Sequence, residues 1–269
     1  MLQKAQLVSL NAVSYLAPNW MEHYQAIARS ISRMLQCEIQ LSASDRQPLD
    51  DLQKRQVDLA FICGLPFIRN CRIAPGQLRA IAAPIMQADR YQNRPVYFSD
   101  IIVRADSPFH CFSDLAGSTV CYNDPGSNSG YYLLRYRLLQ EHSTHFFRQA
   151  VQSGSHQTSI RWVIEGKADC AAIDSTVLEQ ELRVFPELAA QIRIVESSDP
   201  CPMPPIVVSQ QLGEDLIDQI QATLLQPDAE LKAAMTRMNV SRYAAVTTQY
   251  YDAIAKIYDT VINSRFSQL

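Results

Sequence analysis

The sequence predicts an α/β protein made of two doubly wound lobes that are joined by two crossing segments. The first observation is the β-α-β-α-β order expected for residues 5–63, which is half of such a lobe. The second is a similar helix and strand further along the chain, since residues 57–62 and 168–173 share an x-Asp-x-Ala-x-Ile pattern. The third is a pair of extended runs, at 95–104 and 192–205, that separate these units.

The two extended runs set the expected boundaries of the lobes. The first lobe is expected to contain residues 1–97 and 205–269, and the second residues 98–204, including the return crossing. Two crossings between lobes form a hinge, and ligands bind preferentially in clefts at such places. We therefore expect the ligand cleft to lie between the lobes.

The elements of the first lobe follow from hydrophobic periodicity and capping patterns. Asn19 and Glu22 have the spacing of a capping box, and apolar residues then recur at helical spacing to near Gln36. Before this helix we expect a strand at 5–10 and a loop at 11–19; after it come a strand at 38–41, a helix at 49–56 and a buried strand at 57–63.

The second repeat and the C-terminal part are assigned in the same way. A helix at 156–165 is expected to end with Gly166 as its C′ residue, before a strand at 168–173. Four prolines within 200–205 exclude both a helix and a central strand, so this segment is the expected return crossing. A strand at 206–209 and helices at 214–225, 228–238 and 248–263 complete the chain.

The polar loop after residue 122 is the strongest candidate for a binding site. Pro125 and Gly126 form a turn signal after the β-rich run 118–122, and helical spacing follows. Ser127, Asn128 and Ser129 then stand at the expected helix start, where unpaired N–H groups and the helix dipole favour an anion. An ordinary N-cap is the alternative interpretation, because Ser and Asn are common at helix starts.

Composition and charge exclude several classes of function. The 269 residues include 24 basic and 27 acidic ones, giving a net charge of −3 without a basic stripe, so nucleic acid is not an expected partner. No apolar run approaches the roughly 20 residues that span a bilayer. The seven cysteines are scattered without a C-x-x-C pair, which excludes a zinc site and a disulfide framework. We predict no metal, no cofactor and no catalytic residue.

Several segments together resemble one family, and they cover most of the chain. They are residues 57–61, 97–103, 114–117, 123–131, 154–156, 166–169 and 171–175, and the segment 123–131 contains the Ser-Asn-Ser-Gly-Tyr loop at 127–131. This set is similar to the phosphate, phosphite and phosphonate substrate-binding proteins of ABC importers. The resemblance implies the type II periplasmic binding protein fold, a small oxyanion ligand and a transporter permease as partner.

The resemblance also implies roles for particular residues. Those matching Ser127, Asn128 and Ser129 would hold the phosphoryl oxygens, and His156 would donate another hydrogen bond from its own helix start. Tyr97 would line the cleft from the crossing strand.

Each of these residues has a structural alternative, and two more are cleft candidates by position alone. His156 could cap its helix, and Tyr97 could be a packed hinge residue. Tyr15 and Asp174 are the candidates by position, and for Asp174 we favour a simple N-cap.

One departure from the family pattern concerns the ligand. Family members that take an aminoalkyl ligand usually carry an acidic residue in the return crossing, whereas this chain has Cys-Pro-Met-Pro-Pro at 201–205. Asp199 is the nearby carboxylate that would have to reach in. The sequence therefore favours a ligand with a neutral or apolar substituent.

We consider two classes of function besides import of a small oxyanion. One is a cytosolic enzyme on the same fold, such as those that dehydrate chorismate or form the thiamine pyrimidine; the other is a ligand sensor. The resemblance implies a periplasmic or lipid-anchored protein. The absence of a signal-peptide pattern after Met1 and the odd number of cysteines would instead suit the cytoplasm.

Overall fold

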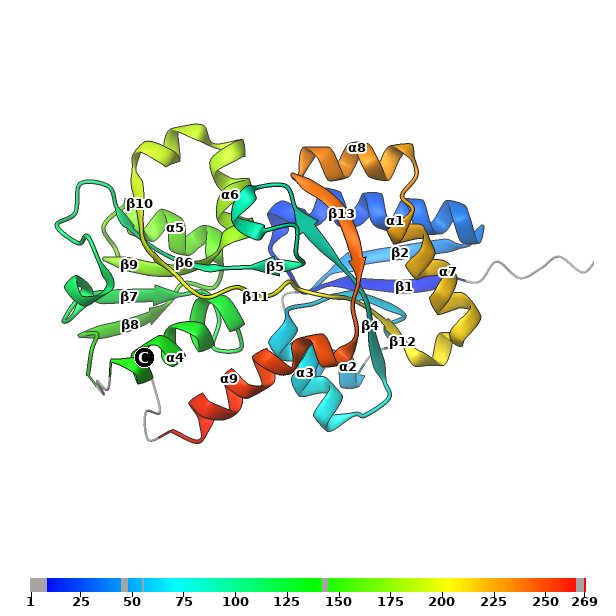
Figure 1. Cartoon of the computed structure of the whole chain (residues 1–269), viewed down its shortest axis with the longest axis horizontal. Coiled ribbons are helices and arrows are strands. Elements are labelled where there is room, and N and C mark those ends of the chain that lie inside the picture. The colour runs from blue at the N-terminus through cyan, green and yellow to red at the C-terminus, as the bar shows by residue number, and fades with distance from the viewer. Residues whose placement is uncertain (1–8, 45–47, 55, 142–144, 265–268) are drawn as a thin grey trace, which may run out of the picture. The chain divides into compact units, whose positions relative to one another are not determined.

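The computed structural model describes residues 9–44, 48–54, 56–141, 145–264 and 269 (Figure 1). The chain divides into two compact units: unit 1 is residues 1–95 with 203–250, and unit 2 is residues 96–202 with 251–269. The boundaries after residues 95 and 202 lie close to the expected crossings. The C-terminal segment differs, because it returns to unit 2 instead of staying with unit 1 and so adds a third crossing.

Unit 1 is built on a mixed six-stranded sheet with the order β13-β4-β12-β3-β1-β2. β1, β2 and β3 are parallel, whereas β12 pairs antiparallel with β3 and β4, and β13 antiparallel with β4. Helices α1, α7 and α8 lie on one face, and α2 and α3 on the other (Figure 1). The strands are β1 Ser9–Ser14, β2 Glu38–Ala43, β3 Leu59–Phe61, β4 Leu78–Met86, β12 Ile206–Ser209 and β13 Val240–Ala245; the helices are α1 Met21–Leu35, α2 Pro48–Lys54, α3 Gly64–Ile73, α7 Glu214–Leu225 and α8 Ala229–Arg237.

Unit 2 is built on a five-stranded sheet with the order β10-β6-β9-β7-β8. A separate two-stranded ribbon pairs β5 with β11. The strands are β5 Val96–Tyr97, β6 Ser99–Arg104, β7 Thr119–Tyr122, β8 Gln149–Gln152, β9 Cys170–Asp174, β10 Ile192–Ser197 and β11 Cys201–Pro202; the helices are α4 Leu133–Gln140, α5 His156–Ile164, α6 Ser175–Val184 and α9 Asp252–Ile262.

The two sheets repeat the same pattern of strands. The parallel strands β2-β1-β3 of unit 1 correspond to the parallel strands β8-β7-β9 of unit 2. In each sheet the next neighbour of this trio is an antiparallel strand, β12 beside β3 and β6 beside β9. The doubly wound arrangement expected from the sequence is therefore present in both units.

The repeated x-Asp-x-Ala-x-Ile pattern has a physical cause. In unit 1, the Asn11 backbone N–H donates to Asp58 Oδ2 at 2.8 Å, while the Asp58 N–H donates to the Asn11 carbonyl at 2.9 Å. In unit 2, Thr119 and Asp169 make the same two bonds at 2.7 and 2.8 Å. Each aspartate thus ties the start of its strand to the neighbouring parallel strand, which fixes the register of the pair.

Alternation along the strands of unit 2 divides its core between the two faces of the sheet. Ile101 and Val103 of β6 join one apolar cluster with Leu134 of α4, while the intervening Ile102 joins the other with Ile160 of α5. Successive side chains of a strand point to opposite faces. Helix α4, which follows the candidate loop, and helix α5, which begins at His156, are therefore anchored on opposite faces of one sheet.

Most elements expected from the sequence are confirmed, with some differences. The strand expected at 5–10 lies mostly outside the described residues, and β1 continues to Ser14 where a loop was expected. The capping box at Asn19 is wrong, because a 3₁₀ turn at Pro18–Trp20 leads into α1 and Trp20 is its N-cap. Elements α3, β4, β8 and β13 were not predicted.

The C-terminal helix belongs to unit 2. Helix α9 contacts α4, β11 and the helical turn that precedes α4, and Tyr258 packs on Tyr132 with ring centroids 5.1 Å apart. Ile254 and Val261 on its inner face are buried. The expected placement of this helix in the first lobe followed from chain order, which carries no information about such packing.

We expect Ile254→Ala to destabilise unit 2 by about 2–5 kcal/mol, because it leaves a cavity under a fully buried side chain. Hydrogen exchange should show lost protection in α4 and α9, with α1 of unit 1 as the internal reference. Equal loss in α1 would contradict the assignment of α9 to unit 2.

Candidate functional site

The polar loop connects a strand to a helix through a turn, as the sequence predicts. β7 ends at Tyr122, and a π-helical turn at Asn128–Tyr132 leads directly into α4. Ser127 is the N-cap of this turn, and its Oγ accepts a hydrogen bond from the Gly130 N–H at 3.1 Å. The N-cap interpretation therefore holds for Ser127, while Asn128 and Ser129 have other partners.

Asn128 joins the loop to the β5–β11 ribbon. Its side chain is fully buried, and Nδ2 donates to the Tyr97 hydroxyl at 2.8 Å and to Cys201 Sγ at 3.3 Å. Tyr97 and Cys201 are direct partners across the ribbon. The Asn128 Oδ1 is buried without a hydrogen-bond partner in the described part of the chain. This amide therefore has its nitrogen paired within the protein and its oxygen unpaired among the described residues.

Ser129 and His156 form a hydrogen-bonded pair between two helix starts. Ser129 Oγ lies 3.1 Å from His156 Nε2, and both residues are buried. His156 is the first residue of α5, whose N-cap Ser155 accepts from the Thr158 N–H at 3.0 Å. Burial lowers the pKa of His156 to about 4, so the imidazole is neutral at pH 7.

Gly130 allows the two helix starts to approach each other. A Cβ at this position would lie 1.9 Å from Asn123 Oδ1 and 3.1 Å from Cε1 of His156. A side chain there would force the Asn123 amide to move. The glycine of the Ser-Asn-Ser-Gly-Tyr motif is thus explained by close contact with Asn123, which follows β7, and with the imidazole ring.

Tyr15 lies in unit 1, where its hydroxyl donates to Asp51 Oδ2 at 3.0 Å. It is half-buried and belongs to the segment that follows β1. The other candidate residues lie in unit 2. A binding role for Tyr15 stays a prediction.

Asp174 is the N-cap of α6, which confirms the favoured interpretation of this residue. Its Oδ1 accepts from the Thr176 N–H at 2.9 Å and from Thr176 Oγ1 at 2.7 Å. Burial raises the pKa of this carboxyl to about 6, with a further contribution from the nearby Asp100. The capping hydrogen bonds therefore explain why the Asp174 carboxylate is buried at this position.

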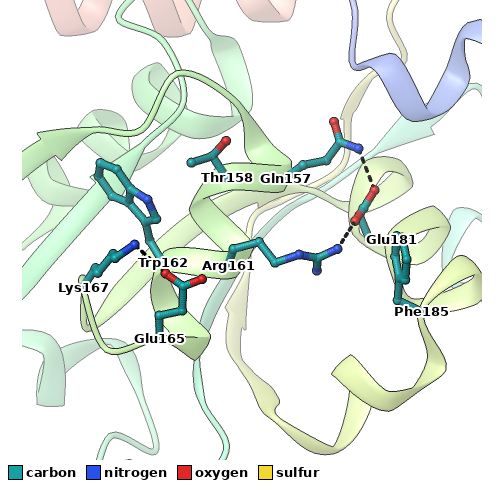
Figure 2. Close-up of a pocket in the computed structure, with 8 residues that line it drawn as sticks. All are labelled: Gln157, Thr158, Arg161, Trp162, Glu165, Lys167, Glu181 and Phe185. Carbon is teal, nitrogen blue, oxygen red and sulfur yellow. Dashed lines mark hydrogen bonds and ion pairs between the residues drawn. The ribbon is translucent and has the colours of Figure 1, made fainter.

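A groove of about 400 Å³ lies beside the site, between α5 and α6, and is lined by Gln157, Thr158, Arg161, Trp162, Glu165, Lys167, Glu181 and Phe185 (Figure 2). Glu181 is buried and is paired with Arg161 at 3.1 Å and with Gln157 at 2.8 Å. These bonds compensate the charge of the buried Glu181 carboxylate, so its presence in the groove needs no ligand to explain it. None of the candidate binding residues lines this groove.

The site that the loop residues build is chemically suited to an anion. The starts of the π turn and α5 direct backbone N–H groups and partial positive charge toward the Ser129–His156 region. Hydroxyl and imidazole groups add neutral hydrogen bonds. Among the residues that the structure describes, no cluster of His, Cys, Asp and Glu could hold a metal ion.

One known family matches most of the chain. The model of the ABC transporter, phosphonate, periplasmic substrate-binding protein family matches residues 12–251. The chain belongs to this family. The match spans both units and includes the polar loop, the ribbon and the start of α5. Within the described ranges, no helix is long and apolar enough to cross a membrane.

One curated relative and two solved structures are similar to this chain. The Escherichia coli (strain K12) phosphonates-binding periplasmic protein is 24% identical over 247 residues, covering 89% of this chain and 70% of that protein. A binding protein component of an ABC phosphonate transporter from Pseudomonas aeruginosa has a TM-score of 0.83 at 16% identity, covering 96% of this chain and 87% of its own. PhnD1 from Prochlorococcus marinus (MIT 9301), solved in complex with methylphosphonate, has a TM-score of 0.80 at 17% identity, covering 96% of this chain and 100% of its own. These structures share the two-lobed type II periplasmic binding protein fold with this chain.

Sequence reasoning missed several residues that shape the loop. Cys201 was read only as part of a proline-rich crossing, yet it accepts a hydrogen bond from Asn128. Asn123 and Gly130 were read as turn and motif residues, and Ser99, whose Oγ donates to the Ser129 carbonyl at 2.8 Å, gave no signal. The glycine was the available clue, since Gly inside a helix start often marks a close approach.

Gly130→Ala should destabilise the protein by roughly 1–3 kcal/mol, because the added methyl group overlaps Asn123 Oδ1. Urea unfolding would measure the loss. A double-mutant cycle with Asn123→Ala is the control, since removing the overlapping amide should recover part of the cost. Additive costs would show that this contact is not the cause.

Asp174→Asn should change how stability depends on pH. The folded pKa of about 6 lies above the ordinary value of 3.8, so the folded protein retains a proton that the unfolded chain loses as pH rises between these values. Asp174 therefore makes the protein less stable as pH rises through this window, by about 3 kcal/mol at most. His156 acts with the opposite sign there, because its folded pKa of about 4 lies below the ordinary 6.5.

The asparagine side chain of this variant can still cap α6 and does not titrate. Relative to the natural protein, the variant should therefore gain stability between pH 4 and pH 7, as measured by urea unfolding at several pH values. A constant difference across this range would show that the Asp174 carboxyl has an ordinary pKa.

Proposed function

We propose that this protein binds a small phosphorus oxyanion, namely a phosphonate, phosphite or phosphate, as the non-catalytic solute-binding component of an ABC importer. The observation that carries the proposal is the buried Ser129–His156 pair placed between two helix starts. An oxyanion of phosphorus has several acceptor oxygens, and neutral donors in a buried site can bind them without a formal Lys or Arg.

Ser127, Asn128, Ser129, His156 and Tyr97 would have different roles in this site. Ser129 and His156 would contact the oxyanion, and Asn128 Oδ1, which Tyr97 and Cys201 leave unpaired, would accept a hydrogen bond from a protonated oxygen of the ligand. Ser127 would act mainly by capping the turn and orienting its N–H groups. Tyr97 would hold the Asn128 amide through its hydroxyl.

The return crossing favours an uncharged substituent on the ligand. Cys201 and Met203 are buried there, and Asp199 is exposed. An ammonium group on the ligand would need a carboxylate near the site to compensate its burial. Methylphosphonate, which one of the related proteins binds in its solved structure, meets this condition. The expected position of the site in an interlobe cleft stays a prediction.

The other two classes of function have less support. The family match and the relatives concern substrate-binding proteins, and they give no support to an enzyme of chorismate or thiamine metabolism or to a sensor. A thermal-shift screen with phosphate, phosphite, methylphosphonate, 2-aminoethylphosphonate, sulfate and chorismate tests the choice. A ligand at a hundred times its Kd adds about 2.7 kcal/mol to stability. Stabilisation by chorismate alone would overturn the proposal.

Ser127→Ala combined with Ser129→Ala should weaken methylphosphonate binding by about 1.5–3 kcal/mol for each charged hydrogen bond lost, as measured by calorimetry. Ser209→Ala is the matched control, because Ser209 also caps a short helix but lies in unit 1. Unchanged affinity in the double variant would remove this loop from the binding site.

A further inference from the structure

The Ser129–His156 pair carries a fixed number of hydrogen-bonding protons. The neutral imidazole has one N–H and the serine has one O–H, and one of these two protons is used in the 3.1 Å bond between them. If Nε2–H donates to Ser129, the serine O–H is left to donate elsewhere and Nδ1 is an acceptor. If the serine donates to Nε2, Nδ1–H is left to donate elsewhere and the serine oxygen keeps acceptor capacity.

Either tautomer therefore presents one donor and one acceptor to a ligand. His156 Nδ1 is buried and has no hydrogen-bond partner in the described residues. Two carbonyl oxygens of the same loop, Asn128 Oδ1 and Asn123 Oδ1, are also buried and unpaired there. Asn123 Oδ1 and the His156 ring share the space beside Gly130.

A fully ionised phosphonate has only acceptor oxygens, so it cannot pair with these acceptors. Buried acceptors that face one another without a proton between them are costly. A phosphonate that keeps one P–OH supplies the missing proton, and its remaining oxygens accept from the serine or imidazole and from the helix-start N–H groups. The donor and acceptor pattern of the loop thus matches the singly charged form.

We propose that this site binds its phosphorus oxyanion with one proton retained on a P–OH group, so that a phosphonate is bound as the monoanion. This inference rests on the proposed function, because it concerns the same loop. It names the ionic form of the ligand that the site selects and Ser129 with His156 as the residues that select it.

The surroundings of His156 favour placing the retained proton on the ligand and not on the imidazole. Helix α5 packs on β6, β7, β9 and α6. The titratable or charged groups on these elements are Asp100 and Arg104 of β6, Cys121 and Tyr122 of β7, Cys170 and Asp174 of β9, and Glu179, Glu181 and Arg183 of α6; α5 itself carries Arg161. The lowered pKa of His156 has burial as its cause, without a contribution from these charges.

The inference has a direct consequence for binding. Above the second pKa of methylphosphonate the free ligand is a dianion, so binding as the monoanion takes up one proton per ligand. Affinity should then fall about tenfold for each pH unit above that pKa. Below it, where the ligand already carries its proton, both the uptake and the pH dependence should disappear.

Calorimetry of the whole protein with methylphosphonate, in buffers of different ionisation enthalpy above and below that pKa, measures the number of protons taken up. One proton above the pKa and none below supports the inference. Binding without proton uptake above the pKa overturns it but leaves the proposed function intact. Absence of binding by methylphosphonate, phosphite and phosphate overturns the proposed function itself.

Two further measurements locate the proton. His156→Gln keeps a donor and an acceptor but cannot titrate, so proton uptake should persist in this variant; its loss would place the proton on the imidazole and overturn the inference. Phosphorus NMR of the ligand bound to the natural protein provides the second measurement. The resonance should match the monoanion above the pKa of the free ligand, and a dianion resonance overturns the inference even if the variant fails to fold.

Discussion

The arrangement of the polar loop depends on the hydrogen bonds from the Asn128 amide to Tyr97 and Cys201. A fully buried amide must be paired, because an unsatisfied donor in the interior costs about 1–3 kcal/mol. Pairing with both strands of the β5–β11 ribbon therefore fixes the start of the π turn relative to the segment that enters unit 2 and the segment that leaves it. Ser129 follows directly in the chain, and its position opposite His156 is a consequence of this constraint.

A second feature is that the predicted donors of the site are neutral. A buried His156 is held neutral by desolvation, and serine hydroxyls carry no charge. A site of this kind attracts an anion through N–H groups and helix dipoles, whose orientation is set by the backbone. It also leaves acceptors beside the donors, which a Lys or Arg side chain would not do. The ionic form of the ligand can therefore be selected by the count of protons in the loop, a property that net charge does not describe.

Some parts of this structure could be predicted from local sequence and others could not. The β7 strand, the turn and the helix start at Ser127 were predictable, because turn residues and helical periodicity act within a few residues. The x-Asp-x-Ala-x-Ile repeat revealed the two like units, since each aspartate closes the same pair of bonds. The placement of α9 in unit 2 and the bond from Asn128 to Cys201 were not predictable, because their partners lie far away along the chain.

By itself the sequence determined the α/β class, two units of like design and the polar loop at a helix start, because hydrophobic period, capping and turn chemistry are local properties. It also brought the family resemblance, through motifs such as residues 127–131 and 154–156. Only the tertiary structure decided which atoms of the loop are paired and which stay unpaired: the Asn128 amide is fixed at one end, Gly130 admits Asn123, and His156 is buried against Ser129. The physical reason is that burial and hydrogen-bond pairing depend on what surrounds a side chain in space, and the residues that surround this loop come from segments that lie far apart along the chain.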